Sequence, residues 1–327
     1  MTFVNGASDM AGKVIAISGG VGGARLSAGL AECVAERDLS IIVNTGDDSH
    51  HFGLMVCPDL DSQMYMLAGL NDEDRGWGQR DESWRTMEMM RTLGEDVWFN
   101  LGDRDMGVNL ARTVRLAGGA RLTEITAGFA HSLGVDVRLL PMTDDPVSTR
   151  IRSDDRIYAF HEWFVQARCA PPAHEILFDG AEAARPTPEV LAALADPKLE
   201  AIIVAPSNPY LSIAPILAVP GMAEALRGAG VPIVGITPIV GGAAIKGPTA
   251  DMLRTFGRPV TAAGVAAIHG DLFDGYLCDK RDPHEPDAWA ALGITARQTD
   301  TMMVDLPART RLARAALDLA AELKGAG

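Results

Sequence analysis

The first part of the chain alternates between short apolar runs and a segment with helical apolar spacing. Residues 13–18 and 39–43 are apolar and rich in β-branched side chains, and residues 24–35 between them repeat apolar positions at helical intervals. Two strands joined through a helix predict a parallel pair with a right-handed crossover, and such sheets bind ligands at the carboxyl ends of their strands. The loops that follow the two runs, residues 19–23 and 44–48, are therefore the first candidates for a site.

The same alternation continues towards the C-terminus. The apolar pattern predicts helices at residues 60–70, 82–93, 122–133 and 188–195, and one more helix that ends at 116. It predicts strands at 97–101, 200–205 and 232–236. The segments at 252–256, 265–269, 272–278 and 311–323 complete a tail in which helices and strands alternate. Residues 71–81, between the first two helices, are charged and interrupted by glycine, which favours a mobile lid.

These segments predict an α/β fold, a Rossmann-like doubly wound, mostly parallel sheet with a smaller inserted α+β subdomain. The core comprises residues 13–136 and 185–327. The insertion, 137–184, has two candidate antiparallel strands at residues 149–152 and 157–160. Residues 1–12 have neither a basic segment nor a continuous apolar run, so we expect a loose N-terminal leader and not a signal peptide.

Composition narrows the class of protein. A chain of 327 residues with 47% hydrophobic and 22% charged residues is typical of a globular protein that buries about three-quarters of its extended surface. Its apolar runs all fall short of the roughly 18 residues that suggest a membrane span, so we expect a cytoplasmic protein with no membrane partner. The four cysteines have no C-x-x-C spacing, which makes a zinc site or a disulfide framework improbable.

Charge adds a constraint on the ligand. The formal net charge is −14, which would repel a nucleic-acid backbone, so we expect no nucleic-acid partner. An acidic protein that binds a diphosphate has to concentrate arginines, backbone N–H groups or a cation at one place. The sequence should therefore show such a place.

A glycine-rich turn follows the first strand. Gly19, Gly20, Gly22 and Gly23, with Val21 between them, let the backbone approach a phosphate, and the next helix would present free N–H groups. The pattern is not a dinucleotide fingerprint, because Arg25 occupies the place of the third glycine, and the P-loop lysine is missing. A tight turn without a ligand is the alternative interpretation.

Four aspartates gather after the second strand, within residues 44–61. Asn44, Thr45 and Gly46 lead into Asp47 and Asp48, and Asp59 and Asp61 follow soon after. Two carboxylates about 4 Å apart repel by on the order of 4 kcal/mol at an effective dielectric of 20, so a cation is the natural neutraliser. Hard oxygen ligands favour Mg²⁺. The alternatives are a turn residue at Asp47 and a helix N-cap at Asp59.

Several weaker candidates complete the set. Arg104, in the sequence Gly-Asp-Arg-Asp after the strand predicted at 97–101, suits a phosphate or a salt bridge within its loop. Trp77 in the predicted lid suits stacking on a planar ring. Ser207, Asn208 and Pro209 follow another predicted strand and suit a base or a ribose. The adjacent histidines at 50 and 51 are more typical of solvated loop residues than of metal ligands.

Taken in order, several long motifs resemble the 2-phospho-L-lactate transferase family, whose bacterial members act as phosphoenolpyruvate transferases. The motifs are SGGVGGARL at 18–26, VNTGDD at 43–48, CPDLD at 57–61, DRGWGQRDESW at 74–84, WFNLGDRD at 98–105, APSNPYLSI at 205–213 and TPIVGG at 237–242. The resemblance runs from about residue 13 to the C-terminus, and the number and order of the motifs make it specific.

The resemblance implies a homodimeric, Mg²⁺-dependent enzyme that makes a precursor of coenzyme F-420. The terminal hydroxyl of the deazaflavin Fo attacks the diphosphate of a phospholactyl- or phosphoenolpyruvyl-guanosine donor, and GMP leaves. Matched by motif, the acidic residues expected to hold the metal and orient the hydroxyl are Asp47, Asp48 and Asp61, with Asp47 or Asp48 as the catalytic group. The residues expected to contact substrates are Gly20, Val21, Gly22, Gly23, Asn44, Asp61, Trp77, Arg104, Ser207, Asn208 and Pro209.

Two other classes of function compete with this transferase. A non-catalytic regulator that binds a nucleotide or a nucleotide sugar would share the glycine and Ser-Asn-Pro motifs, but the segments at 74–84 and 102–105 favour the enzyme. A nicotinamide dehydrogenase needs an acidic ribose ligand near Asp47, but the broken glycine pattern argues against it.

Overall fold

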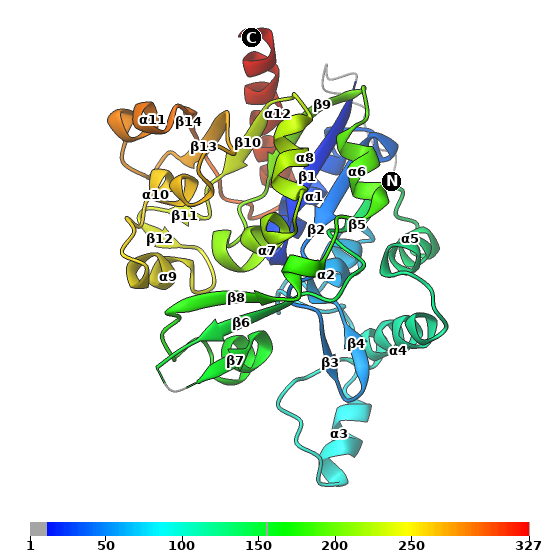
Figure 1. Cartoon of the computed structure of the whole chain (residues 1–327). Helices are drawn as coiled ribbons and strands as arrows, with labels where there is room; N and C mark the ends of the chain where they lie inside the picture. Colours follow the sequence, from blue (N-terminus) through cyan, green and yellow to red (C-terminus); the bar gives the residue numbers. More distant parts are fainter. Residues whose placement is uncertain (1–11, 155, 327) are drawn as a thin grey trace.

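Seven parallel strands form the central sheet, in the order β14-β13-β10-β9-β1-β2-β5 (Figure 1). The computed structural model describes residues 12–154 and 156–326. The strands are β1 (Lys13–Ser18), β2 (Leu39–Val43), β5 (Arg138–Pro141), β9 (Leu199–Val204), β10 (Ile233–Ile236), β13 (Gly275–Asp279) and β14 (Thr295–Thr299). The expected doubly wound α/β fold is confirmed.

Alternating side chains of β1 supply both hydrophobic layers of the core. Val14 and Ala16 pack on one face of the sheet, and Ile15 and Ile17 pack on the other. The first face is covered by α1 (Gly20–Ala31), α2 (Pro58–Leu67), α5 (Leu122–Ser132) and α12 (Leu306–Ala326); the second by α6 (Pro188–Leu194), α7 (Ala214–Ala218), α8 (Met222–Gly228), α10 (Ala262–Ala266) and α11 (Pro286–Leu292).

Smaller elements lie beyond the carboxyl edge of this sheet. The hairpin of β3 (Ser49–His51) and β4 (Leu54–Val56) leads towards α3 (Arg85–Thr92), which projects at the bottom of Figure 1, and α4 (Asp103–Ala117) lies beside the hairpin. A separate antiparallel sheet has the order β7-β6-β8, with β6 (Ser148–Arg152), β7 (Ile157–Ala159) and β8 (Glu175–Asp179). The remaining elements are β11 (Ile239–Val240), β12 (Ala243–Ala244), α9 (Thr249–Thr255), η1 (Glu36–Asp38), η2 (Glu162–Gln166), η3 (Ala181–Ala183), η4 (Pro209–Ile213) and η5 (Ala267–His269).

The structure corrects one expected strand and leaves the domain division as a prediction. Residues 97–101 form no strand, so the Gly-Asp-Arg-Asp segment does not follow a strand of the sheet. Within the predicted insertion, 137–184, β5 pairs with β2 in the central sheet, whereas β6, β7 and β8 pair with one another. The predicted leader lies outside the described residues except for Gly12.

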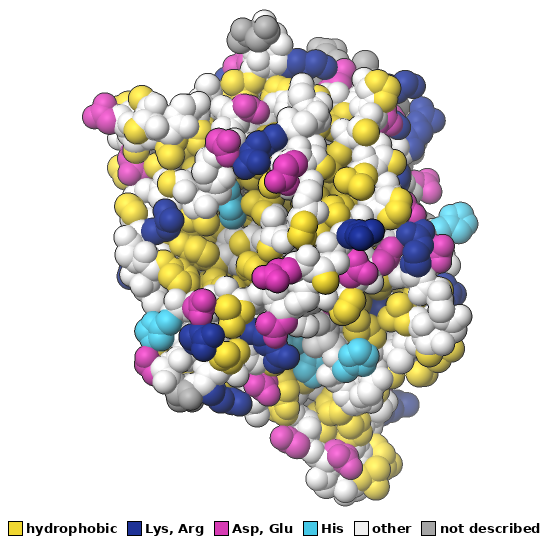
Figure 2. All heavy atoms as spheres, in the orientation of Figure 1, with side chains coloured by type: hydrophobic (Ala, Val, Ile, Leu, Met, Phe, Trp, Pro, Cys, Tyr) yellow, Lys and Arg dark blue, Asp and Glu magenta, His cyan; other side chains and the backbone are white. Residues whose placement is uncertain are grey.

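The surface and the helices bear on two further expectations. On the face drawn in Figure 2, basic side chains are scattered among acidic ones and form no continuous patch. In the part of the chain that the structure describes, no single helix is long and apolar enough to cross a membrane, although one pair bent by 87°, Pro209–Ala218 with Met222–Gly228, passes by length and composition. The four cysteines are free, and three of them are buried.

Candidate active site

The glycine turn after β1 is shaped by its contacts with neighbouring loops. Gly20 has φ +67°, a left-handed conformation that favours glycine. A Cβ atom on Gly19 would lie 2.7 Å from Asp59 Oδ2, and one on Gly23 would collide with the Ser18 hydroxyl. A Cβ on Gly22 would lie 3.0 Å from the Pro206 carbonyl oxygen. Close packing therefore accounts for most of the glycines that the sequence alone suggested were there for a ligand.

Asp59 joins this turn to the loop after β2. Its Oδ1 accepts a hydrogen bond of 2.7 Å from the Gly20 N–H, and its Oδ2 accepts one of 2.9 Å from Asn44 Nδ2. Asn44 Oδ1 in turn accepts the Gly46 N–H at 2.8 Å. The alternative interpretation of Asp59 as an N-cap is wrong, because Cys57 occupies the N-cap position of α2, without a capping hydrogen bond from its side chain, and Asp59 lies in the first turn. Burial raises the pKa of Asp59 to about 6.

Asp47 and Asp48 follow immediately and carry oxygens without partners. Asp47 Oδ1, both carboxylate oxygens of Asp48 and the hydroxyl of Thr45 are buried and accept no hydrogen bond from the described residues. Burial, followed by the charge of Asp59, raises the pKa of Asp47 well above its usual range. Burial likewise raises the pKa of Asp48, against the opposing effects of the Cys57 thiol and the Arg112 guanidinium. Such oxygens are costly to bury unless something binds them.

Asp61 is paired with an arginine that the sequence did not indicate. Arg112 of α4 donates a short hydrogen bond to Asp61 Oδ1 and further hydrogen bonds to Asn109 Oδ1 (2.7 Å) and to the Met55 carbonyl oxygen (3.2 Å). Arg112 is 2% exposed, so this is a buried ion pair between α2 and α4. Burial raises the pKa of Asp61 and Arg112 opposes the rise. The only sequence signal was a polar pair, Asn109 and Arg112, at helical spacing.

A second buried carboxylate, Asp105, lies close to this pair. Tyr65 Oη donates a hydrogen bond of 2.6 Å to Asp105 Oδ1. Burial, with the charge of Asp61 as the next cause, raises the pKa of Asp105 to about 7. Sequence reasoning saw Asp105 only as a part of the Gly-Asp-Arg-Asp segment and did not mark it as a buried acid.

That segment begins a helix and does not converge on the glycine turn. The N–H groups of Arg104 and Asp105 donate to the Glu82 carboxylate at 2.9 Å each, and Asp103 accepts the N–H groups of Arg85 and Thr86 at the start of α3. The exposed Arg104 side chain donates to the Arg80 carbonyl oxygen at 3.2 Å. Charge-assisted capping at two helix starts therefore explains these acidic residues.

The Ser-Asn-Pro loop after β9 is tied to the glycine turn. Ser207 Oγ donates to the Gly19 carbonyl oxygen at 2.6 Å. Asn208 Oδ1 accepts the N–H groups of Tyr210 and Leu211 and so caps the turn that begins at Pro209. The structure thus brings Ser207 beside the glycines, as expected, and occupies Asn208 Oδ1 with a capping role.

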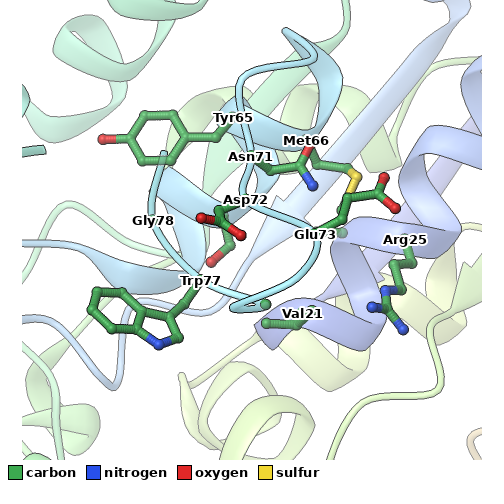
Figure 3. Close-up of a pocket in the computed structure, with 12 residues that line it drawn as sticks. Val21, Arg25, Tyr65, Met66, Asn71, Asp72, Glu73, Trp77 and Gly78 are labelled. Atoms are coloured by element: carbon green, nitrogen blue, oxygen red, sulfur yellow. The ribbon is translucent and has the colours of Figure 1, made fainter. Parts of the chain in front are cut away.

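Trp77 lies in the loop between α2 and α3, over a shallow pocket next to α1. Figure 3 shows Trp77 and Gly78 on one side of the pocket and Val21 and Arg25 on the other. Trp77 is 42% exposed. The Arg75 guanidinium lies 5.1 Å from its ring centroid and 4.9 Å from that of Trp84. An exposed ring beside the α1 N-terminus is available for stacking.

The expectation that both histidines are solvated is wrong for His51. His50 is exposed, but the ring of His51 stacks on Phe99 at 3.7 Å, and its Nε2 lies 2.9 Å from Nδ1 of the buried His161. Burial lowers the pKa of His51 to about 4 and that of His161 to about 3. The pair joins β3 to the β6–β8 subdomain.

Two carboxylates of the site, those of Asp47 and Asp48, fit the ligand chemistry of a magnesium ion. Within residues 12–154 and 156–326, no three His, Cys, Asp or Glu side chains converge into a metal-binding group. Mg²⁺ needs no such group, because it is usually held by one or two carboxylates together with substrate phosphates and water. The unpartnered oxygens of Asp47 and Asp48 provide such carboxylates. Asp61, with one oxygen on Arg112, stays a prediction as a ligand.

A doubly wound parallel sheet with these loops at its carboxyl edge places the protein in the class of Rossmann-like α/β proteins, a class whose ligands commonly bind at the carboxyl ends of the strands. A crystal structure of a UPF0052 family member from Bacillus halodurans shares this fold, with a TM-score of 0.65, 16% identity, and coverage of 94% of this chain and 99% of that chain.

Within this class, the chain belongs to the 2-phospho-L-lactate transferase CofD family, whose model matches residues 14–307. It is similar to phosphoenolpyruvate transferases from Kitasatospora aureofaciens (42% identity over 319 residues), Streptomyces coelicolor (41% over 320) and Mycobacterium tuberculosis (40% over 328). These alignments cover 95%, 96% and 94% of this chain and 99%, 100% and 98% of the relatives. The family expected from the motifs is thereby confirmed, and with it a transferase of coenzyme F-420 biosynthesis.

Proposed function

We propose that the protein transfers a phosphoenolpyruvyl or 2-phospholactyl group from a guanosine diphosphate-linked donor to the terminal hydroxyl of Fo. The names of the relatives favour the phosphoenolpyruvyl donor. The observation that carries the proposal is the set of buried oxygens of Asp47 and Asp48 that have no partner among the described residues, in a loop that Asn44 and Asp59 connect to the glycine turn at the start of α1. An acidic protein needs such a place to assemble positive charge around a diphosphate.

The reaction replaces the phosphoanhydride bond of the donor with a phosphate ester bond to Fo at the same phosphorus, and the ester to the three-carbon acid is kept. The Fo hydroxyl oxygen attacks the phosphorus that carries the three-carbon acid, the bond between the two phosphates breaks, and GMP leaves with the bridging oxygen. The hydroxyl proton passes to a carboxylate, for which Asp47 is our candidate because its Oδ1 is buried in the site without a hydrogen-bond partner among the described residues. A bound Mg²⁺ would supply positive charge to the phosphate oxygens.

The chain's own residues position the two substrates. The N–H groups of α1 that follow Gly20, with the positive end of the helix dipole, are our candidates for contacts with the diphosphate. Trp77 offers a flat surface beside the same helix, and the Ser207 loop closes the other side of the glycine turn. Positioning of this kind is the main contribution of proteins to phosphoryl-type transfer.

Substitution of the two aspartates tests this function. Asp47→Asn and Asp48→Asn should each reduce Mg²⁺-dependent release of GMP by about a thousandfold or more, because each removes a charge that no neighbour replaces. Asp136→Asn, at an exposed position, is the matched control and should retain full activity. Full activity in both active-site variants, with folding intact, would contradict the proposed transferase function.

A regulator that binds a nucleotide sugar without catalysis remains the alternative. It has support only from the shared fold, whereas the family match and the relatives' names favour the transferase. Tight binding of a nucleotide sugar combined with no measurable affinity for Fo would favour the regulator. The homodimer also stays a prediction, for which light scattering of the purified protein is the direct measurement.

A further inference from the structure

Asp59 differs from Asp47 and Asp48 because both of its oxygens already have partners. Its Oδ1 accepts the Gly20 N–H and its Oδ2 accepts Asn44 Nδ2, at 2.7 and 2.9 Å. The residue is 4% exposed. Asp47 Oδ1 and both oxygens of Asp48, in contrast, have no hydrogen-bond partner among the residues that the structure describes. The four aspartates therefore do different things, although the sequence presents them as one acidic cluster.

The Gly20 N–H is the first amide of α1, where an anionic ligand would ordinarily be expected. Here an internal carboxylate occupies it. The same carboxylate lies against the Gly19 backbone, because a Cβ on Gly19 would be 2.7 Å from Asp59 Oδ2. Asp59 thus holds Gly20 in its left-handed conformation and leaves the following amides of the turn to a ligand.

The contact continues through Asn44 to the catalytic loop. Asn44 Nδ2 donates to Asp59, and Asn44 Oδ1 accepts the N–H of Gly46, the residue before Asp47. A displacement of Asp59 would therefore move both the glycine turn and the backbone that carries Asp47 and Asp48. A chain of three hydrogen bonds couples the loops after β1 and β2.

We propose that Asp59 is a positioning residue that fixes these two loops relative to one another, and that it is not a metal ligand. Its carboxylate matters for the hydrogen bonds it accepts from Gly20 and Asn44. This inference rests on the proposed function only in the activity measurement described below.

A reciprocal exchange of Asp59 and Asn44 tests the proposal. In Asp59→Asn, the new amide group turns a donor towards either Asn44 Nδ2 or the Gly20 N–H, so one hydrogen bond is lost. In Asn44→Asp, two buried carboxylates meet. In the double variant Asn44→Asp/Asp59→Asn, the new Asn donates to the new Asp and accepts from Gly20, and the total charge is that of the original pair.

Three quantities should be measured for each variant: hydrogen exchange of the segment that contains Gly20, the melting temperature, and GMP release with Fo and donor. Each single variant should exchange about tenfold faster at this segment and transfer about a hundredfold more slowly. The double variant should recover the exchange rate and return to within about tenfold of the original activity. Asp136→Asn serves as the control for loss of one carboxylate.

A metal ligand would behave differently. If the carboxylate of Asp59 binds the metal, the double variant recovers slow exchange but stays as inactive as Asp59→Asn, and this result would overturn the proposal. Unchanged exchange in Asp59→Asn would overturn it as well. If a single variant fails to fold, recovery of folding in the double variant supports the coupling, and failure to recover contradicts it. The exchange measurement stands even if the unaltered protein transfers nothing, a result that would contradict only the proposed function.

Discussion

The carboxylates of Asp47 and Asp48 occupy positions that cost folding free energy. Asp47 Oδ1 and both oxygens of Asp48 are buried without a hydrogen-bond partner in the described part of the chain, and burial raises the pKa of both groups. A protein retains such groups where a ligand repays the cost, and the same groups then trade stability for activity. The structure therefore predicts opposite effects of one substitution on stability and on function.

Asp48→Asn should raise the free energy of unfolding by about 1 kcal/mol in the absence of metal, because the charge of Asp48 is disfavoured first by burial and then by Asp61 and Asp59, and these effects outweigh those of Cys57 and Arg112. Mg²⁺ together with the donor should raise the melting temperature of the original protein and not that of the variant. Calorimetry with and without a chelator provides both numbers. A variant that is destabilised without metal would show that Asp48 has a structural partner in solution.

The buried histidines predict how stability depends on pH. The pKa values of His51 and His161, about 4 and about 3, lie below the ordinary 6.5, so the unfolded chain binds protons first as the pH falls. The contribution of these two neutral histidines to the free energy of unfolding is thus fully present above pH 6.5. It is lost on acidification towards pH 4, by at most about 1.4 kcal/mol per pH unit for each histidine.

His161→Asn should make this loss shallower, since one proton-binding site is removed from the unfolded chain. Urea unfolding at a series of pH values measures the slope. His131→Asn, at an exposed position, is the matched control and should leave the slope unchanged. Equal slopes for His161→Asn and the original protein would mean that His161 is not buried in the neutral form.

At the scale of elements, the Asp61–Arg112 pair links α2 to α4 underneath the acidic loop. Both side chains are buried, and Arg112 also holds the Met55 carbonyl oxygen of β4. The pair therefore fixes the β3–β4 hairpin and α4 against the helix that carries Asp59 and Asp61. Removal of one partner leaves an uncompensated charge in the interior.

Arg112→Met should lower the free energy of unfolding by about 3–5 kcal/mol, because it strands the Asp61 carboxylate. Arg112→Met/Asp61→Asn should recover a large part of this loss, since neither charge then remains. Denaturant titration of the three proteins measures the coupling. Equal losses in the single and the double variant would show that Arg112 acts through packing and not through its charge.

For the whole molecule, the parts of the fold that depend on the local pattern of apolar and polar residues could be predicted from the sequence. β1 and β2 have the predicted bounds, because buried parallel strands are continuous apolar runs. The strand expected at 97–101 was wrong, because an apolar run next to a turn does not reveal whether a neighbouring strand exists to pair with it. β5 and β14 were missed for a different reason: both are short strands at the edges of the sheet, and neither is a continuous apolar run.

The site was predictable only where its residues lie next to one another in the sequence. The glycine turn, Asp47 and Asp48 share one sheet edge because the parallel order of β1, β2 and β9 brings three loops together. Arg112 could not be found in this way, because its partner Asp61 is 51 residues away. The separate role of Asp59 likewise depends on which donors face it.

The central claim concerns the molecule as a catalyst, and the mass of its product tests it most directly. The purified protein should be incubated with Fo, Mg²⁺ and the phosphoenolpyruvyl or the 2-phospholactyl guanosine donor in separate reactions, and the products weighed by mass spectrometry. The account predicts an Fo species heavier by the transferred phospho-acid group, formed together with an equal amount of GMP, and foremost with the phosphoenolpyruvyl donor. Recovery of Fo and both donors unchanged would contradict it.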